Sequence, residues 1–187
     1  GCHFLADEIA KREPKLHILV NNAGATWGAP IADYPDDAFD KVMNLNVKGI
    51  FHLTRFLLPR LESAASATDP ARVINIGSID GLQAPAMETY AYSSSKAAVH
   101  QLTRHLAHSL APRKIIVNAI APGPFESKMM AETLQRFGEG IRASNPLGRI
   151  GEPSDMAGTA IFLSAKASAY ITGTVIPVDG GISTRHQ

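Results

Sequence analysis

The sequence predicts an α/β fold, a doubly wound parallel sheet with helices on both faces. Short runs rich in β-branched residues alternate along the chain with longer segments of helical spacing. Polar or glycine-rich motifs follow three of these runs, as expected where ligands bind outside the carboxyl ends of parallel strands. The 187 residues are 45% hydrophobic, which is enough for one core. We therefore expect a single domain over residues 1–187.

Four apolar runs have the composition of strands. Each has five or six residues, contains isoleucine or valine, and lies near asparagine, glycine or proline residues. Short runs of this kind fit strands that are buried between helices. We expect strands at Leu16–Val20, Arg72–Ile76, Ile115–Ile120 and Thr174–Val178.

The longer segments fit helices. Pro35 followed by Asp36 and Asp37 is typical of a helix start, because proline suits the first turn and acids favour the positive end of the helix dipole. The third helix has an apolar stripe that comprises Val99, Leu102, Leu106 and Leu110. The expected helices cover Phe4–Lys11, Pro35 to about Leu61 with a break near Asn46, Tyr90–Leu110 and Pro153–Leu163.

Residues 122–151 contain glycine, proline and one short helical piece, so we expect a substrate lid there. Within it, the segment Gly138-Glu139-Gly140-Ile141-Arg142-Ala143 fits the dinucleotide-binding pattern G-x-G-x-x-A. That pattern binds dinucleotides only where it follows a strand and opens a helix. No strand precedes it here, so we interpret it as part of the lid.

The composition excludes several classes of partner. Lys and Arg number 18 and Asp and Glu 17, so charge gives no basis for binding nucleic acid or an anionic membrane. No apolar run is long enough to span a bilayer. The single cysteine, Cys2, has no disulfide partner, which favours a reducing, cytoplasmic location. His105 and His108 lie three residues apart, but no carboxylate or cysteine joins them at ligand spacing, so we expect no metal site.

Tyr92 and Lys96 carry the clearest chemical signal. A helix places them one turn apart on the same face. An ammonium beside a phenol favours the phenolate, so we expect Lys96 to lower the pKa of Tyr92 from about 10 toward neutrality. A surface pair that occurs by chance has the same spacing. However, Ser78 precedes Tyr92 by 14 residues, and Asn46 opens the segment Asn46-Val47-Lys48-Gly49.

Together with Asn21-Asn22-Ala23-Gly24, these residues resemble the catalytic tetrad and cofactor segments of the short-chain dehydrogenase/reductase family. The resemblance implies a Rossmann-like fold and NAD(P)-dependent oxidoreductase activity. It implies that Tyr92 is the general acid and that Ser78 polarises the substrate oxygen. It further implies that Lys96 holds the nicotinamide ribose and keeps the pKa of Tyr92 low, and that Asn46 anchors a water that resupplies protons. For each of these residues alone, an ordinary structural role is an equally good interpretation.

The same resemblance identifies cofactor contacts beyond Tyr92 and Lys96. One group, in the first strand's loop, lies beneath the adenosine ribose, whereas Asn21 braces the sheet. A second group resembles the segment whose backbone meets the nicotinamide carboxamide. An ordinary strand-to-loop turn has a similar composition. The implied cofactor-binding residues are Asn22, Ala23, Gly24, Pro122, Gly123, Phe125 and Ser127.

The glycine-rich turn and the residue that separates NAD from NADP precede, in this family, the point where this sequence begins. We therefore expect the domain to be N-terminally incomplete and to lack the first strands. A polypeptide of this sequence alone would then expose Leu16–Val20 at a sheet edge and be inactive.

Within the family, the chain is most similar to 3-oxoacyl-(acyl-carrier-protein) reductases of the rhamnolipid-biosynthesis type. The run Arg72–Ser78, its spacing to Tyr92 and the ending Thr174–Gly181 resemble 3-oxoacyl reductases in general. The Trp27-Gly28 loop and the serine/alanine linker near Ser63–Thr68 resemble the rhamnolipid type. The resemblance implies NADPH rather than NAD, a homotetramer or homodimer, and an acyl-thioester or other small-molecule substrate. Arg113 occupies a position that docks acyl carrier protein in related enzymes, although an exposed helix-end cation fits equally well. The alternatives are a sugar or polyol dehydrogenase and a non-catalytic, truncated binding or oligomerisation module.

Overall fold

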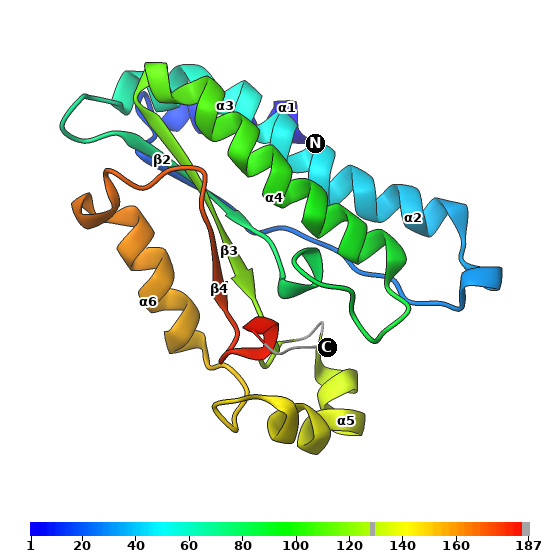
Figure 1. Ribbon diagram of the computed structural model, residues 1–187. Coiled ribbons are helices and arrows are strands. Elements are labelled where there is room, and N and C mark those ends of the chain that lie inside the picture. Colours follow the sequence, from blue (N-terminus) through cyan, green and yellow to red (C-terminus); the bar gives the residue numbers. More distant parts are fainter. Residues whose placement is uncertain (128–129, 185–187) are drawn as a thin grey trace.

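The computed structural model describes residues 1–127 and 130–184 and contains one parallel sheet (Figure 1). Its strand order is β1-β2-β3-β4, with every neighbouring pair parallel. The strands are β1 (Ile18–Asn21), β2 (Ala71–Ile76), β3 (Ile115–Pro122) and β4 (Val175–Val178). All four expected strands are present, and no end point differs from the expected one by more than two residues.

Helices connect the strands and cover both faces of the sheet. They are α1 (Cys2–Arg12), α2 (Asp36–Met43), α3 (Ile50–Ala64), α4 (Tyr90–Leu110), α5 (Ala131–Ser144) and α6 (Pro153–Ser164). In Figure 1, α3 and α4 lie over one face of the sheet and α6 lies over the other. The doubly wound, Rossmann-like architecture predicted from the sequence is therefore confirmed.

The two faces have separate apolar cores because alternate side chains of a strand point to opposite faces. Val73 and Val117 pack with the helices α1, α3 and α4, whereas Ile74 and Ile120 pack with Leu163 of α6. These four strand residues are almost fully buried. The two central strands thus form a rigid base for the loops that follow them.

β1 differs from the expectation of a fully buried strand. Leu19 and Asn21 are buried, whereas Ile18 and Val20 are 38% and 47% exposed. The exposure follows from its position, because β1 pairs only with β2 and forms an edge of the described sheet. The edge position itself agrees with the sequence analysis.

A π-helix (Asn44–Gly49) joins α2 to α3, at the position where the sequence predicts a break near Asn46. Pro35 caps α2, and Asp36 and Asp37 occupy its first turn, as predicted. π-Helical turns are rare and are common at functional sites. This one turns the buried side chain of Asn46 toward the loop that follows β1.

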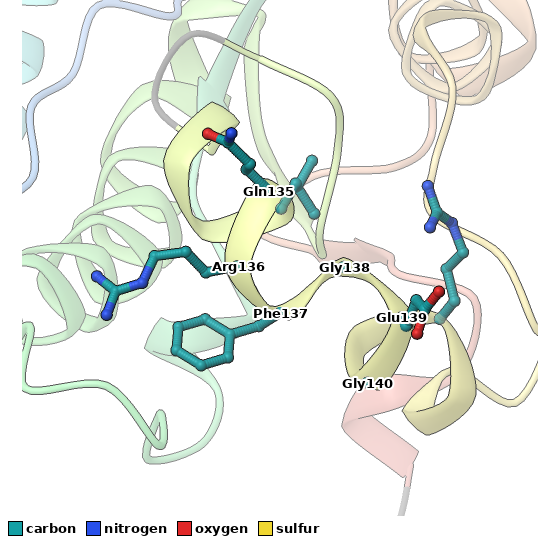
Figure 2. A pocket seen from close by; sticks show the side chains of 8 residues that line it. Gln135, Arg136, Phe137, Gly138, Glu139 and Gly140 are labelled. Atoms are coloured by element: carbon teal, nitrogen blue, oxygen red, sulfur yellow. The ribbon is translucent and has the colours of Figure 1, made fainter.

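Within residues 122–151, the predicted short helix is α5, which contains the whole Gly138–Ala143 pattern. Figure 2 shows an open hollow along α5 in which Gln135, Arg136, Phe137 and Glu139 point in different directions. One helix supplies every residue of this hollow, and no strand leads into it. The interpretation of the pattern as part of the lid segment therefore agrees with its position. Residues 128 and 129 of the predicted lid lie outside the described residues.

None of the helices formed by the described residues is long and apolar enough to cross a membrane.

Candidate active site

The candidate site lies at the carboxyl ends of the strands, where the first turns of α4 face the loops after β1 and β2 (Figure 1). Tyr92 and Lys96 are on the same face of α4, and the Lys96 Nζ lies 5.4 Å from the centre of the Tyr92 ring. The Lys96 side chain is buried, and its Nζ donates a hydrogen bond to the carbonyl of Ile76 at the end of β2 (2.7 Å). The predicted pair is thus formed, and strand β2 orients its lysine.

Burial of Lys96 has a direct electrostatic consequence. Removal of an ammonium from water disfavours its charged form, and this lowers the pKa of Lys96 from 10.5 to about 8. No carboxylate among the described residues forms an ion pair with Lys96. The Lys96 ammonium is buried, has no ion-pair partner in the described part of the chain and donates one hydrogen bond, so its other N–H groups can bind a polar ligand.

The expected lowering of the Tyr92 pKa was wrong. Burial raises the pKa of Tyr92, the Ser78 hydroxyl partly opposes this effect, and the Asp80 carboxylate adds to it. The spacing of Tyr92 and Lys96 along the helix could not reveal these effects. Asp80 lies on the turn after β2, and the burial of Tyr92 depends on how the chain packs around α4. A phenol that retains its proton at neutral pH is a proton donor, which is the form that a reduction requires.

Ser78 begins the turn that follows β2 and caps a short 3-10 helix (Ile79–Gly81). Its side chain is buried and accepts a hydrogen bond from the backbone N–H of Asp80 (3.1 Å). The 3-10 helix that Ser78 begins packs on α4, and the Ser78 hydroxyl acts against the rise in the pKa of Tyr92 that burial causes. The structure therefore brings Ser78, Tyr92 and Lys96 into one cluster.

Asn46 joins three segments of the site. Its Oδ1 accepts from the N–H of Ala25, and its Nδ2 donates to the carbonyl of Ala25 and to Ser95 Oγ, each at 2.9 Å. Ser95 in turn donates to the carbonyl of Tyr92 (2.7 Å). The amide hydrogens of Asn46 are therefore both used within the protein, and its predicted role in anchoring a water stays a prediction.

The loop after β1 lies beside the cluster. It contains Asn22, Ala23 and Gly24, and a Cβ added at Gly24 would lie 3.4 Å from Asn46 Oδ1 and 3.7 Å from Lys96 Nζ. Asn21 at the end of β1 donates to Asn75 and Thr54, so it braces the sheet as expected. The absence of a side chain at Gly24 leaves backbone accessible next to the lysine.

The predicted nicotinamide segment follows β3. Pro122 ends this strand, and Gly123 packs so closely on Asp179 that a Cβ would lie 2.7 Å from the Asp179 Cβ. The ring of Phe125 packs on Gly151, and Ser127 Oγ accepts from the N–H of Met130. These two side chains make their contacts within residues 122–151. Their predicted role in cofactor binding stays a prediction.

Sequence reasoning missed several partly or fully buried polar residues near the site. Asp179 accepts from the backbone N–H groups of Gly181 and Ser183, and these bonds lower its pKa although burial opposes them. Asn145 donates to the carbonyl of Asp179 (3.1 Å). His100, one turn beyond Lys96, is fully buried. Only His100 had a usable signal, namely its spacing of four residues from Lys96.

The low pKa of Lys96 gives a testable pH dependence. We expect kcat/KM for ketone reduction to be constant below about pH 7 and to fall as pH rises through about 8, because the free enzyme then loses the Lys96 ammonium while Tyr92 keeps its proton. The measurement is a pH profile of the full-length protein and of Lys96→Arg, whose cation persists. A fall at the same pH in both proteins would show that another group titrates.

The chain is similar to known proteins over nearly its whole length. The family model described as Enoyl-(Acyl carrier protein) reductase matches residues 2–183. The rhamnolipids biosynthesis 3-oxoacyl-[acyl-carrier-protein] reductase of Pseudomonas aeruginosa is 50% identical over 184 residues, which cover 97% of this chain and 72% of that protein. A 3-oxoacyl-[acyl-carrier-protein] reductase of Thermotoga maritima is 33% identical over 95% of this chain and 70% of its own length.

Solved structures of similar proteins share the fold of this chain. The Pseudomonas aeruginosa RhlG/NADP active-site complex has a TM-score of 0.94 and 48% identity, and the match covers 98% of this chain and 72% of that one. A gluconate 5-dehydrogenase from Burkholderia cenocepacia in complex with NADP and tartrate has a TM-score of 0.91 and 28% identity, over 99% of this chain and 71% of that one. Both descriptions name NADP, and both structures share the fold of this chain.

Proposed function

This chain belongs to the short-chain dehydrogenase/reductase family, and on that premise we propose that it is an NADPH-dependent reductase of 3-oxoacyl thioesters. The observation that carries the proposal is the cluster of Ser78, Tyr92 and the buried Lys96 at the carboxyl ends of the strands. Two relatives that are 50% and 33% identical and are described as 3-oxoacyl-[acyl-carrier-protein] reductases support this substrate class.

The residues present fit a nicotinamide cofactor. The accessible backbone at Gly24 and the unused donors of Lys96 lie next to each other, as binding of ribose hydroxyls requires. Asn22, Ala23 and the backbone of Pro122, Gly123, Phe125 and Ser127 would complete the contacts. When bound, NADPH supplies the hydride that reduces the carbonyl carbon. The NADP in the Pseudomonas aeruginosa structure supports the phosphorylated form.

The side chains would then handle the charge on the substrate oxygen. Addition of hydride to the carbonyl carbon leaves the negative charge of an alkoxide on that oxygen. Ser78 donates a hydrogen bond to the oxygen, and Tyr92 transfers its phenolic proton to it, which yields the alcohol. Lys96 stabilises the resulting phenolate through its ammonium.

A sugar or polyol dehydrogenase is the second candidate, and the similarity to the gluconate 5-dehydrogenase structure favours it. Parallel assays distinguish the two. We expect kcat/KM of the full-length protein with a 3-oxoacyl thioester and NADPH to exceed that for NADP-linked oxidation of gluconate by at least roughly 100-fold, the ratio that a site built for its substrate's polar groups reaches easily. A higher kcat/KM for gluconate would contradict the proposed 3-oxoacyl thioester substrate, and the family assignment would still hold.

Carrier-protein binding is a separate question. Arg113 lies at the end of α4 remote from Tyr92, about 30 Å away along the helix at 1.5 Å per residue, and pairs with Glu62 (3.1 Å). This position also fits a helix-end cation. If acyl carrier protein docks at Arg113, Arg113→Glu raises KM for the carrier-bound substrate and leaves KM for a small thioester unchanged. Equal KM values for the carrier-bound substrate before and after the change would exclude docking there.

We also expect a homotetramer or homodimer. Large apolar side chains are exposed on the outer surfaces of α3 and α6 and on the loop before β4, and such patches favour association. They are Phe51, Ile161, Phe162 and Tyr170.

A further inference from the structure

His100 is a buried histidine with no evident partner. It lies on α4, four residues after Lys96 and eight after Tyr92, so these three side chains share one face of the helix. Only 2% of its surface is exposed, and neither ring nitrogen has a hydrogen-bond partner within the described part of the chain. An unpaired buried polar group destabilises a fold, and leucine would fill a similar volume without that penalty. The imidazole therefore calls for an explanation other than packing volume.

The ring lies directly beneath the turn that carries Ser78. A Cβ added at Gly77 would lie 2.2 Å from His100 Nε2 and 2.7 Å from its Cδ2. A Cβ added at Gly81 would lie 2.9 Å from His100 Cε1. The turn thus rests on the edge of the ring at both of its glycines, one before Ser78 and one after it.

Two further contacts hold the turn. The N–H of Gly77 donates to the carbonyl of Ile120 in β3 (2.7 Å), and Gly81 packs on the α4 backbone, where a Cβ would lie 2.6 Å from Ala97 N. The His100 ring, β3 and the α4 backbone therefore all contact the turn that carries Ser78. A shift of the ring would move the Ser78 backbone relative to α4, which carries Tyr92.

The electrostatics favour a neutral ring. Burial lowers the pKa of His100, and the charges of Arg104 and Lys96 lower it further. The Gly81 backbone opposes this effect, although it forms no hydrogen bond of normal geometry with the ring. A neutral imidazole places no second cation beside Lys96.

We propose that His100 is a positioning residue: its ring sets the distance between the Ser78 turn and α4 and so holds the Ser78 hydroxyl beside the Tyr92 phenol. The inference rests on the proposed function, because it assigns His100 an effect only through Ser78. It gives the ring no contact with the substrate.

A double-mutant cycle tests the coupling. We expect His100→Leu to lower kcat for ketone reduction roughly tenfold to 100-fold, since small misplacements of a catalytic group have effects of this size, with KM for NADPH unchanged. We expect Ser78→Ala to lower kcat further and the double variant to equal Ser78→Ala, because His100 has no effect once the hydroxyl is gone. His105→Leu, an exposed histidine on the same helix, is the control and should keep the wild-type rate.

The outcomes separate the two claims. If Ser78→Ala lowers kcat and the loss in the double variant equals the product of the two single losses, the inference about His100 is overturned. The proposed function still stands in that case. An unaffected Ser78→Ala would overturn the proposed role of Ser78 and, with it, the role of His100.

A folding measurement tests the contact without any assay of activity. Gly77→Ala should lower Tm strongly, and His100→Ala in the same chain should restore much of the loss, because the remaining contact, with the Ile120 carbonyl oxygen at 3.2 Å, needs only a small shift. Gly81→Ala is the matched control. Its Cβ also meets the α4 backbone, so His100→Ala should not rescue it. The proposed contact between His100 and Gly77 would be contradicted if His100→Ala restored Tm equally in both glycine variants, or in neither.

Discussion

Substitution of Tyr92 by phenylalanine should lower kcat for ketone reduction roughly 100- to 10,000-fold, the usual contribution of a positioned general acid. The change removes one oxygen and keeps the ring that lies 5.4 Å from Lys96 Nζ. NADPH affinity, measured by fluorescence titration of the full-length protein, should therefore stay close to the wild-type value. The rate should fall without loss of cofactor binding, since the proton donor alone is missing.

Tyr90→Phe is the matched control for this prediction. Tyr90 lies two residues earlier on α4, and its hydroxyl donates to Glu88 rather than to the site (3.2 Å). We expect this variant to keep the wild-type rate. Retention of more than about a tenth of the rate by Tyr92→Phe would mean that another group supplies the proton.

Substitution of Lys96 by methionine should change function and stability in opposite directions. We expect kcat/KM to fall at least roughly 100-fold and NADPH binding to weaken, because a preorganised cationic donor is lost. Stability should be unchanged or greater at neutral pH, because burial disfavours the ammonium: the pKa is about 8 in the folded state and 10.5 in the unfolded state. The unfolded state binds the proton more tightly, so the penalty is fully present below pH 8 and is relieved between about 8 and 10.5.

Urea unfolding and steady-state kinetics on the same preparations check this result. Lys48→Met, on the exposed side of the π-helix, is the control and should change neither quantity markedly. A Lys96→Met protein with normal turnover would remove Lys96 from the mechanism. A protein that unfolds far more readily would show that Lys96 is mainly structural.

Most of the fold could be predicted because local patterns determine it. The bounds of α4 agree with the sequence analysis, and the π-helix lies at the predicted break. The resemblance to the family predicted that Ser78, Tyr92 and Lys96 lie in one site, and the position of Ser78 after a strand agreed with it.

The wrong predictions concern residues whose contacts are with residues distant in the sequence. The apolar stripe predicted for α4 includes Leu102 and Leu106, which are only partly buried, whereas Thr103 and His100 are almost fully buried. Thr103 is buried because it accepts from Asn75 of β2, a contact that no helical period reveals. The direction of the Tyr92 pKa shift was missed for the same reason, since burial and Asp80 determine it. The lid assignment for residues 122–151 stays a prediction.

Isotope tracing tests the central claim most directly. The full-length protein would be incubated with NADPH that carries deuterium at its transferable position, together with a 3-oxoacyl thioester or the corresponding 2-enoyl thioester. We predict that the 3-oxoacyl substrate is consumed one-for-one with the cofactor and becomes a 3-hydroxyacyl thioester with deuterium at C3, as hydride delivery to a carbonyl carbon requires. Reduction of the enoyl thioester to a saturated product, with the 3-oxoacyl substrate untouched, would contradict the account.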